Sequence, residues 1–226
     1  MLEKHQDYAA TVARFHWNIP QRYNIGVDVC DRWAQAEPDR LALIDAPEGG
    51  AVTHYSYGAL RAGSNRLANA LAALGLGRGA GLPPRVGVML PQRVETALAH
   101  IAVTKLGCIS IPLFTLFGPE ALLHRLRHSG ARVVITDAAG AEKLASLRGE
   151  LPGLTHVISV DGAAPGVLDF AALCAAASDQ FTPVDTLADD PALLIYTSGT
   201  TGNPKGALHA HRVLLGHMPG VEISHD

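Results

Sequence analysis

Short apolar runs alternate with longer amphipathic stretches through most of the chain. The apolar runs predict strands at residues 86–90, 108–112, 132–136, 155–160 and 192–196. The stretches between them place apolar residues three and four positions apart and predict helices at residues 92–106, 119–130, 140–148 and 168–177. Apolar strands that alternate with helices are typical of a parallel sheet covered on both faces. We therefore predict an α/β fold with a doubly wound, mostly parallel sheet and flanking helices.

The residues before this alternation predict a smaller set of elements. A short helix is expected at residues 27–37, followed by a hairpin from residues 41–44 and 52–57. A longer helix is expected at about residues 56–74, with Gly75 as its stop. The glycines that follow have the spacing of a flexible connector.

Composition excludes several classes of partner. The chain has 226 residues, of which 48% are hydrophobic and 17% charged, enough for one large domain or two small ones. The net charge is −3 and aromatic residues make up 5%, so a nucleic-acid surface is not supported. No stretch approaches the roughly 18 apolar residues of a membrane helix, and the first 20 residues do not have the pattern of a signal peptide.

Cysteine usage indicates a reducing compartment. Cys30, Cys108 and Cys174 are far apart, lie in apolar surroundings and form no C-x-x-C pair. Buried free thiols are the simplest interpretation, and a cytoplasmic location is expected from them.

The most informative segment is residues 196–206, Tyr-Thr-Ser-Gly-Thr-Thr-Gly-Asn-Pro-Lys-Gly, which directly follows a predicted strand. Its glycines allow backbone N–H groups to approach anionic oxygens closely. Its four Thr and Ser hydroxyls add donors, and Lys205 adds a compact positive charge. Such loops can form a concave anion site, so we predict that this loop binds a polyphosphate. A polar surface turn is the alternative.

Three other motifs do not fit this segment. A Walker loop needs Ser or Thr after its lysine, and Gly206 stands there. A hydrolase elbow needs a glycine two places before Ser198, and Tyr196 stands there. The glycine series at residues 75–81 lacks the dinucleotide-binding spacing and follows a helical pattern.

The order Y-T-S-G-T-T-G-x-P-K-G closely resembles the phosphate-loop signature of the adenylate-forming superfamily, which includes acyl- and aryl-CoA synthetases, firefly luciferase and peptide-synthetase adenylation domains. Four further segments also stand in family order, at residues 24–33, 53–60, 86–91 and 107–113. The resemblance covers nearly the whole chain and is strongest to acyl-CoA synthetases.

The resemblance implies a reaction in two halves. A carboxylic acid reacts with ATP, in the presence of Mg²⁺, to give acyl-AMP and pyrophosphate, and coenzyme A then takes the acyl group. Lys205 is the implied catalytic residue, because it would stabilise charge on the departing phosphates. The implied phosphate-binding residues are Thr197, Ser198, Gly199, Thr200, Thr201, Gly202 and Lys205. Metal ligands are not identified.

Motifs expected later in the family are missing. Members carry Y-G-x-T-E and T-G-D motifs, whereas the one Tyr-Gly pair here, at residues 57–58, is followed by Ala-Leu, and Thr-Gly-Asp does not occur. We expect an incomplete N-terminal part of an adenylate-forming enzyme, inactive alone and missing the C-terminal part. Residues 1–185 would form an α/β subdomain. Residues 186–226 would supply a strand, the phosphate loop and a following helix of an incomplete nucleotide-binding subdomain. A non-catalytic nucleotide- or polyphosphate-binding fragment or module is the alternative.

Four polar residues near the loop could be mistaken for catalytic groups. His209 and His211 are expected to be ordinary polar positions at the start of the next helix, with a metal-binding pair as the alternative. Asp189 and Asp190 precede the last strand, away from its carboxyl end, and are expected to be solvated loop residues.

Three apolar residues after the strand at 108–112 have two interpretations. Phe114, Leu116 and Phe117 either border an acyl pocket or pack in the core. The sequence names neither the acid nor the oligomeric state.

Overall fold

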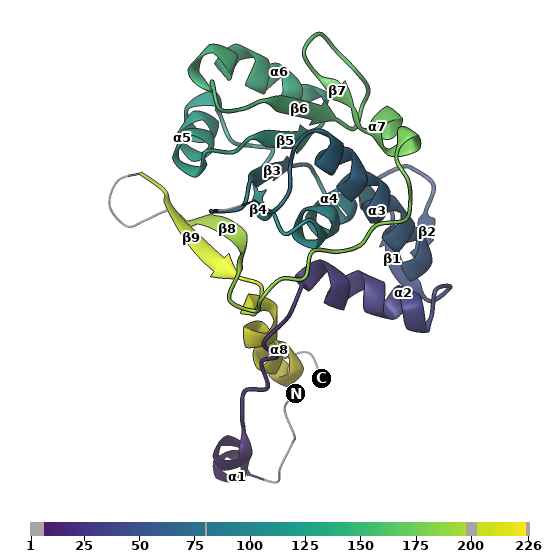
Figure 1. Cartoon of the computed structure of the whole chain (residues 1–226), viewed down its shortest axis with the longest axis vertical. Helices are drawn as coiled ribbons and strands as arrows, with labels where there is room; N and C mark the ends of the chain where they lie inside the picture. The colour runs from purple at the N-terminus through teal and green to yellow at the C-terminus, as the bar shows by residue number, and fades with distance from the viewer. Residues whose placement is uncertain (1–6, 80, 198–202, 225–226) are drawn as a thin grey trace.

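The computed structural model describes residues 7–79, 81–197 and 203–224 and is built around a seven-stranded sheet (Figure 1). The strands lie in the order β7-β6-β5-β3-β4-β8-β9. Neighbouring strands are parallel except β8 and β9, which are antiparallel. This confirms the predicted mostly parallel sheet. The strand bounds are β3 Arg85–Met89, β4 Ile109–Pro112, β5 Val133–Thr136, β6 His156–Ser159, β7 Leu168–Asp169, β8 Pro191–Thr197 and β9 Lys205–Ala210.

Helices cover both faces of the sheet and form two separate hydrophobic clusters. The first cluster packs one face against α3, α4 and α7, and the second packs the other face against α5 and α6. The sheet is therefore doubly wound, as predicted. The helix bounds are α3 Tyr57–Ala73, α4 Val94–Lys105, α5 Pro119–Ser129, α6 Ala138–Leu147 and α7 Phe170–Ala176, with a 3₁₀ turn η2 at Arg148–Glu150.

The strand residues alternate between the two clusters. In β5, Val133 and Ile135 belong to the first cluster and Val134 to the second, and all three are fully buried. Because both faces of the sheet are covered, such a strand is a continuous apolar run. This is why the sequence pattern located these strands.

Helix ends follow local backbone chemistry. Gly107 and Gly130 have φ values of 68° and 63° and end α4 and α5, as predicted. The Asp137 carboxylate accepts the Gly140 N–H at 2.7 Å and caps α6. The predicted helix at 168–177 begins two residues later, because Leu168–Asp169 pairs with β6 as the edge strand β7.

The N-terminal part packs beside the main sheet. A π-helical turn η1 at Val27–Asp31 continues into α2, Arg32–Ala36, where one short helix was predicted. Strands β1, Leu41–Asp45, and β2, Thr53–Ser56, form an antiparallel pair, which confirms the predicted hairpin.

The segment after the phosphate loop differs from the prediction of a helix. Residues Lys205–Ala210 form β9, which pairs with β8, and helix α8, Val213–Ser224, begins after it. The pairing supplies hydrogen bonds from the preceding strand across the loop, which the periodicity of residues 205–210 alone does not reveal. Strands on both sides of residue 185 share one sheet, and the boundary between two subdomains at this point stays a prediction.

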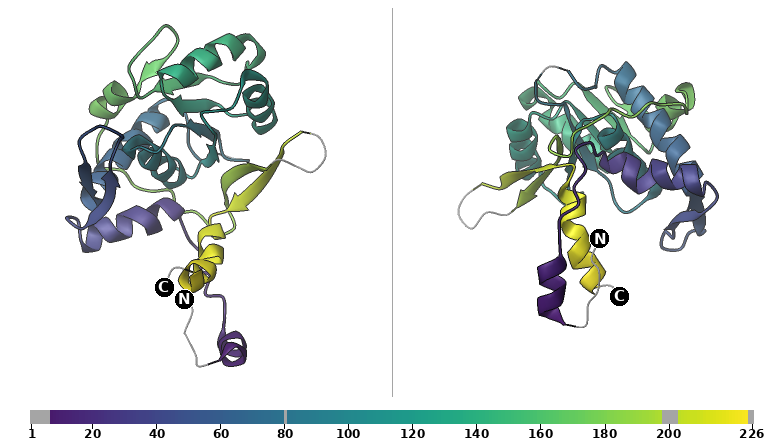
Figure 2. Two further views of the ribbon diagram at one scale, coloured as in Figure 1. Left: turned by 180° about the vertical axis from the view of Figure 1, so that it is seen from behind. Right: turned by 60° about the horizontal axis from the view of Figure 1, so that its bottom comes forward.

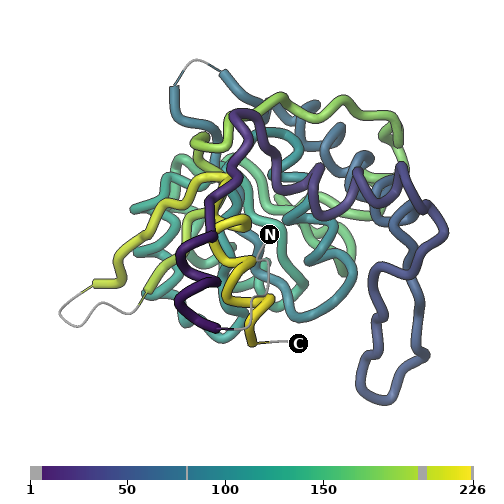
Figure 3. Tube along the Cα trace, turned by 90° about the horizontal axis from the view of Figure 1, so that it is seen from below, coloured from purple at the N-terminus to yellow at the C-terminus, as the bar shows by residue number. Residues whose placement is uncertain are grey.

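Helix α1, Tyr8–Arg14, and α8 both lie outside the body formed by the sheet and its covering helices (Figures 2 and 3). Neither contains a buried residue. Across the described ranges, every helix is too short or too polar to cross a lipid bilayer.

His211 is a buried residue that joins the end of β9 to the N-terminal segment, and not the ordinary polar position that was predicted. Its side chain is fully buried, and its Nδ1 accepts the Ile25 backbone N–H at 3.2 Å. Burial lowers the pKa of His211 to about 4, although the Asp190 carboxylate opposes this shift. The imidazole is therefore neutral in the folded protein at neutral pH.

Lowering the pH from 7 to 4 is expected to reduce the free energy of unfolding by up to about 3 kcal/mol through His211. The unfolded imidazole takes up a proton near pH 6.5, whereas the folded one stays neutral to about pH 4. The contribution of His211 to the free energy of unfolding is thus fully present above pH 6.5 and is lost as the pH falls towards 4. Urea unfolding across this range measures the slope. The control is His211→Asn, whose Oδ1 can still accept the Ile25 N–H; equal slopes in both proteins would contradict the prediction.

Candidate phosphate-binding site

The antiparallel hairpin of β8 and β9 brings two predicted site residues together. Thr197, the last residue of β8, is paired with Lys205, the first residue of β9. Directly opposed residues of antiparallel strands project to the same face, and both residues are exposed. The other predicted phosphate contacts lie outside the described residues: Ser198, Gly199, Thr200, Thr201 and Gly202.

The hairpin stands at the edge of the sheet where ligands bind in α/β folds. Strand β8 runs parallel to β4, so Thr197 lies at the carboxyl edge of the sheet. Ligands of open α/β sheets bind beyond these carboxyl ends. The position of Thr197 and Lys205 therefore agrees with a nucleotide site.

Gly206 allows close packing inside the hairpin. It is paired with Tyr196, and a Cβ at Gly206 would lie 3.0 Å from Leu194 Cδ1 and 3.4 Å from Tyr196 Cε1. The separation from Leu194 is shorter than ordinary van der Waals contact, and that from Tyr196 is at its lower limit. The final glycine of the motif therefore has a packing role beside any role in ligand binding.

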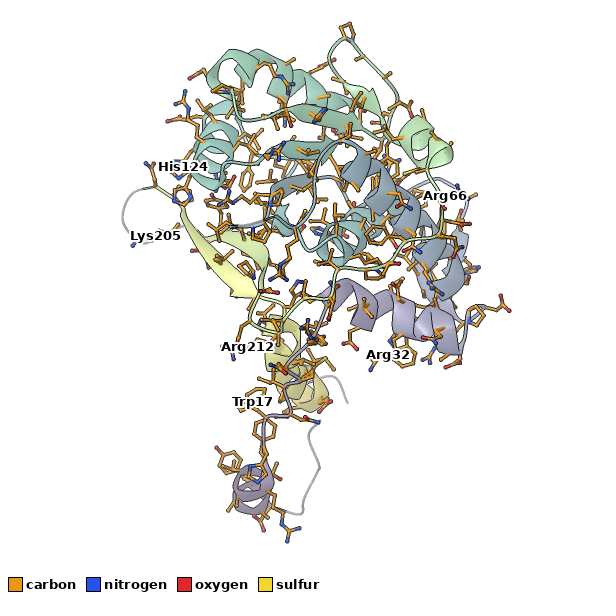
Figure 4. All side chains as sticks on the ribbon, in the orientation of Figure 1. Trp17, Arg32, Arg66, His124, Lys205 and Arg212 are labelled. Atoms are coloured by element: carbon orange, nitrogen blue, oxygen red, sulfur yellow. The ribbon has the colours of Figure 1, made fainter. Side chains whose placement is uncertain are left out.

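Helix α5 flanks the hairpin and contributes residues that sequence reasoning missed. The Tyr196 hydroxyl donates to the Arg125 carbonyl at 3.1 Å and lies 2.8 Å from His128 Nδ1. His124 Nε2 lies 3.1 Å from the Pro204 carbonyl. Figure 4 shows His124 and Lys205 at the same end of the hairpin. The one sequence signal was the spacing of two histidines four residues apart on a helix.

A groove of about 730 Å³ lies between α5 and the described residues Asn203 and Pro204. Two arginines line it, but each already has protein contacts. Arg125 donates to the Ala121 carbonyl and lies 3.9 Å above the Phe117 ring, and Arg127 pairs with Glu150 at 3.0 Å. Lys205, by contrast, has no ion-pair partner among the described residues, so its ammonium is available to an anion.

The two predicted loop carboxylates have different environments. Asp189 pairs with Arg212 at 2.9 Å and is 70% exposed, in agreement with the predicted solvated position. Asp190 is 17% exposed, pairs with Arg78 and accepts the Leu187 N–H at 2.7 Å, so it is a structural residue and the prediction for it was wrong. Burial alone would raise the pKa of Asp190. The pKa nevertheless lies below the ordinary value, because Arg78 and the Leu187 N–H stabilise the charged form.

The apolar residues after β4 are not core residues as a group. Phe114 and Leu116 are 73% and 91% exposed, which contradicts core packing for both. Phe117 is partly buried against the second cluster. Their role at an acyl pocket stays a prediction.

His209 lies within β9, paired with Leu193, and is not part of a helix. In the part of the chain that the structure describes, no group of three His, Cys, Asp or Glu side chains could hold a metal ion. The three cysteines are free; Cys30 and Cys108 are buried as expected, and Cys174 is partly buried. Burial raises the pKa of Cys108 to about 12, which makes this thiol unreactive.

The fold and the hairpin together define an α/β domain with a candidate phosphate-binding loop at its carboxyl edge. A family model described as AMP-binding enzyme matches residues 30–225. The chain therefore belongs to this adenylate-forming family.

Similar proteins are CoA ligases for several acids. The chain is 32% identical over 213 residues to acetyl-coenzyme A synthetase of Syntrophus aciditrophicus (strain SB), covering 87% of this chain and 32% of the relative. It is 34% identical over 217 residues to 4-coumarate–CoA ligase 5 of Oryza sativa subsp. japonica, covering 92% and 38%. The structure of the anthranilate CoA ligase AuaEII in complex with anthranoyl-AMP is similar with a TM-score of 0.80 and 29% identity, covering 90% and 38%. The chain thus spans about a third of the length of these curated relatives.

Proposed function

We propose that this chain is the N-terminal portion of an ATP-dependent acid–thiol ligase, which forms acyl-AMP and then an acyl-CoA. The observation that carries the proposal is the pairing of Thr197 with Lys205 beside the signature loop, at the carboxyl edge of the sheet. Family membership supports the same function, because the similar proteins are named as CoA synthetases and ligases.

In the first half-reaction, a carboxylate oxygen of the acid attacks the α-phosphorus of ATP. The bond from this phosphorus to the bridging oxygen breaks, and acyl-AMP and pyrophosphate form. Negative charge grows on the departing β- and γ-phosphates, and the Lys205 ammonium stabilises it. The Thr197 hydroxyl, on the same face, donates to a phosphate oxygen.

In the second half-reaction, the thiol of coenzyme A attacks the acyl carbon and AMP leaves. Mg²⁺ would neutralise phosphate charge in the first half. The described residues contain no cluster of metal-binding side chains, so we assign no Mg²⁺ ligand to this chain.

The proposal covers carboxylic acids as a class and does not specify one acid. The similar proteins are named for acetate, 4-coumarate and anthranilate, which differ in size and aromaticity. We propose a cytoplasmic location, which the three free cysteines support.

For the 226-residue chain alone, we propose weak ATP binding without acyl-AMP formation. The chain covers about a third of its relatives and contains neither Y-G-x-T-E nor T-G-D. Half of a nucleotide site can contact phosphates but cannot hold the adenine, the ribose and the acid together for in-line attack.

Pyrophosphate release tests both proposals. The complete ligase is expected to release pyrophosphate with ATP, Mg²⁺, CoA and at least one acid of a panel of short, medium and aromatic acids, whereas the 226-residue chain is not. Absence of acid-dependent release across the panel would overturn the ligase function. Turnover by the short chain at the rate of the complete ligase would overturn its inactivity.

A further inference from the structure

We propose that His124 and His128 are positioning residues, which fix the β8–β9 hairpin against α5 and so set the location of Lys205. The inference rests on the proposed phosphate-binding role of Lys205. Neither histidine belongs to the signature motif, and both lie on a helix some 70 to 80 positions earlier in the chain, as the contacts of His128 and His124 show.

Helix α5 is a firm support for such contacts. Leu122 and Leu126 are 0% and 2% exposed and anchor the helix in the second hydrophobic cluster. His124 and His128, four residues apart, lie on one face of the helix. Their rings stack with centroids 5.9 Å apart and planes at 20°. The two imidazoles are therefore presented together on a fixed helix.

The proton positions at His128 follow from its neighbours. The Arg125 carbonyl can only accept, so the single hydroxyl proton of Tyr196 is donated to it, at 3.1 Å. The Tyr196 oxygen is then the acceptor for His128 Nδ1 at 2.8 Å. With the hydroxyl proton on the Arg125 carbonyl, His128 carries its proton on Nδ1.

The same reasoning applies to His124 and the other strand. The Pro204 carbonyl can only accept, so His124 donates from Nε2 at 3.1 Å. The two contacts thus fall on Tyr196, next to Thr197, and on Pro204, next to Lys205. Each contact falls one residue away from a proposed phosphate-binding side chain.

The outer half of the hairpin has little other support. Strand β8 pairs with β4 at Leu193, which lies near the start of β8 and opposite Ser110. Beyond that point Ile195 is 39% exposed and Leu208 52% exposed, and Figure 1 shows the hairpin extending away from the other strands. The contacts from α5, together with the packing of Tyr196 against the second cluster, fix the outer half, and hence Lys205, relative to the sheet.

The first test is the imidazole tautomers of the 226-residue chain, measured by long-range ¹⁵N–¹H correlation spectra at pH 8. We expect His128 with its proton on Nδ1 and His124 with its proton on Nε2. Tyr196→Phe should return His128 to the commoner Nε2-protonated form. A wild-type His128 protonated on Nε2 would overturn the inference.

The second test is the affinity for inorganic tripolyphosphate, measured by calorimetry on the same chain. Tyr196→Phe and His124→Ala are each expected to weaken binding about five- to tenfold, the effect of one lost hydrogen bond. His124→Gln, which retains an N–H donor, should restore part of the loss. The matched control is His54→Gln, an exposed histidine on β2, which should bind as wild type.

Coupling to Lys205 separates positioning from general destabilisation. If α5 acts by placing Lys205, the loss caused by Tyr196→Phe should vanish in a Lys205→Ala background. An equal loss in both backgrounds, or no loss in the wild-type background, would overturn the inference. If wild type and Lys205→Ala bind tripolyphosphate equally, the proposed role of Lys205 in phosphate binding is wrong. The positioning role of the two histidines depends on it and is then wrong too. In that case the tautomers show only whether the contacts between α5 and the hairpin exist.

Discussion

Replacing Lys105 with methionine is expected to lower the free energy of unfolding by about 3–5 kcal/mol. The Lys105 side chain is fully buried, and its Nζ lies 2.5 Å from an Asp31 carboxylate oxygen. The ammonium also donates to Ser64 Oγ at 2.8 Å and to Asn65 Oδ1 at 2.9 Å. Methionine fills most of the volume but leaves the Asp31 carboxylate, 12% exposed, without its opposite charge.

The expected loss of stability is large because the Lys105 ammonium joins three helical elements. Lys105 ends α4, Asp31 ends η1, and Ser64 and Asn65 lie on α3. Burial lowers the pKa of Lys105, and the Asp31 carboxylate opposes this by stabilising the charged form. The charged pair is therefore retained in a place where either charge alone would be costly.

Urea unfolding at pH 7 measures this effect. The double variant Lys105→Met with Asp31→Asn should lose less stability than Lys105→Met alone, because no unpaired charge then remains. Lys143→Met is the matched control. Lys143 donates to the Thr115 carbonyl at 2.6 Å and is only partly buried, so its loss should cost about 1 kcal/mol. A Lys105→Met protein as stable as this control would refute the account.

The main sheet was predictable because it is buried on both faces. Strands such as β5 then appear as short apolar runs, and Gly107 and Gly130 mark the helix ends through their left-handed backbone. Strand β9 escaped prediction because Leu208 is exposed and the segment has no continuous apolar run. Its strand character comes from pairing with the preceding strand β8, which the composition of residues 205–210 alone does not indicate.

The candidate site likewise contains residues that the sequence predicted and residues that it did not. Thr197 and Lys205 followed from an ordered local motif, and the structure places them opposite each other. His124 and His128 gave only a weak signal, since two histidines four residues apart are usual on a solvated helix face. Their partners, Pro204 and Tyr196, lie far along the chain. Only the tertiary fold reveals that α5 and the hairpin meet.

In the complete ligase, Lys205→Ala is expected to reduce kcat for acyl-AMP formation by about 10²–10³. In the proposed mechanism the Lys205 ammonium acts on charge that develops on the departing phosphates, so its loss should lower kcat more than it raises the KM for ATP. Acid-dependent exchange of labelled pyrophosphate into ATP measures this half-reaction. Lys143→Ala serves as the control, since Lys143 contacts the Thr115 carbonyl and lies outside the hairpin.

The second half-reaction gives the sharper comparison. When acyl-AMP is supplied ready-made, the β- and γ-phosphates are absent, so the proposed role of Lys205 towards their charge does not arise in this half. Thioester formation by Lys205→Ala should therefore proceed within about twofold of wild type. If Lys205→Ala slowed both halves equally, Lys205 would instead support the fold or the domain arrangement, and the assignment of its ammonium to the phosphates would fail. Normal pyrophosphate exchange in this variant would exclude a catalytic role for Lys205.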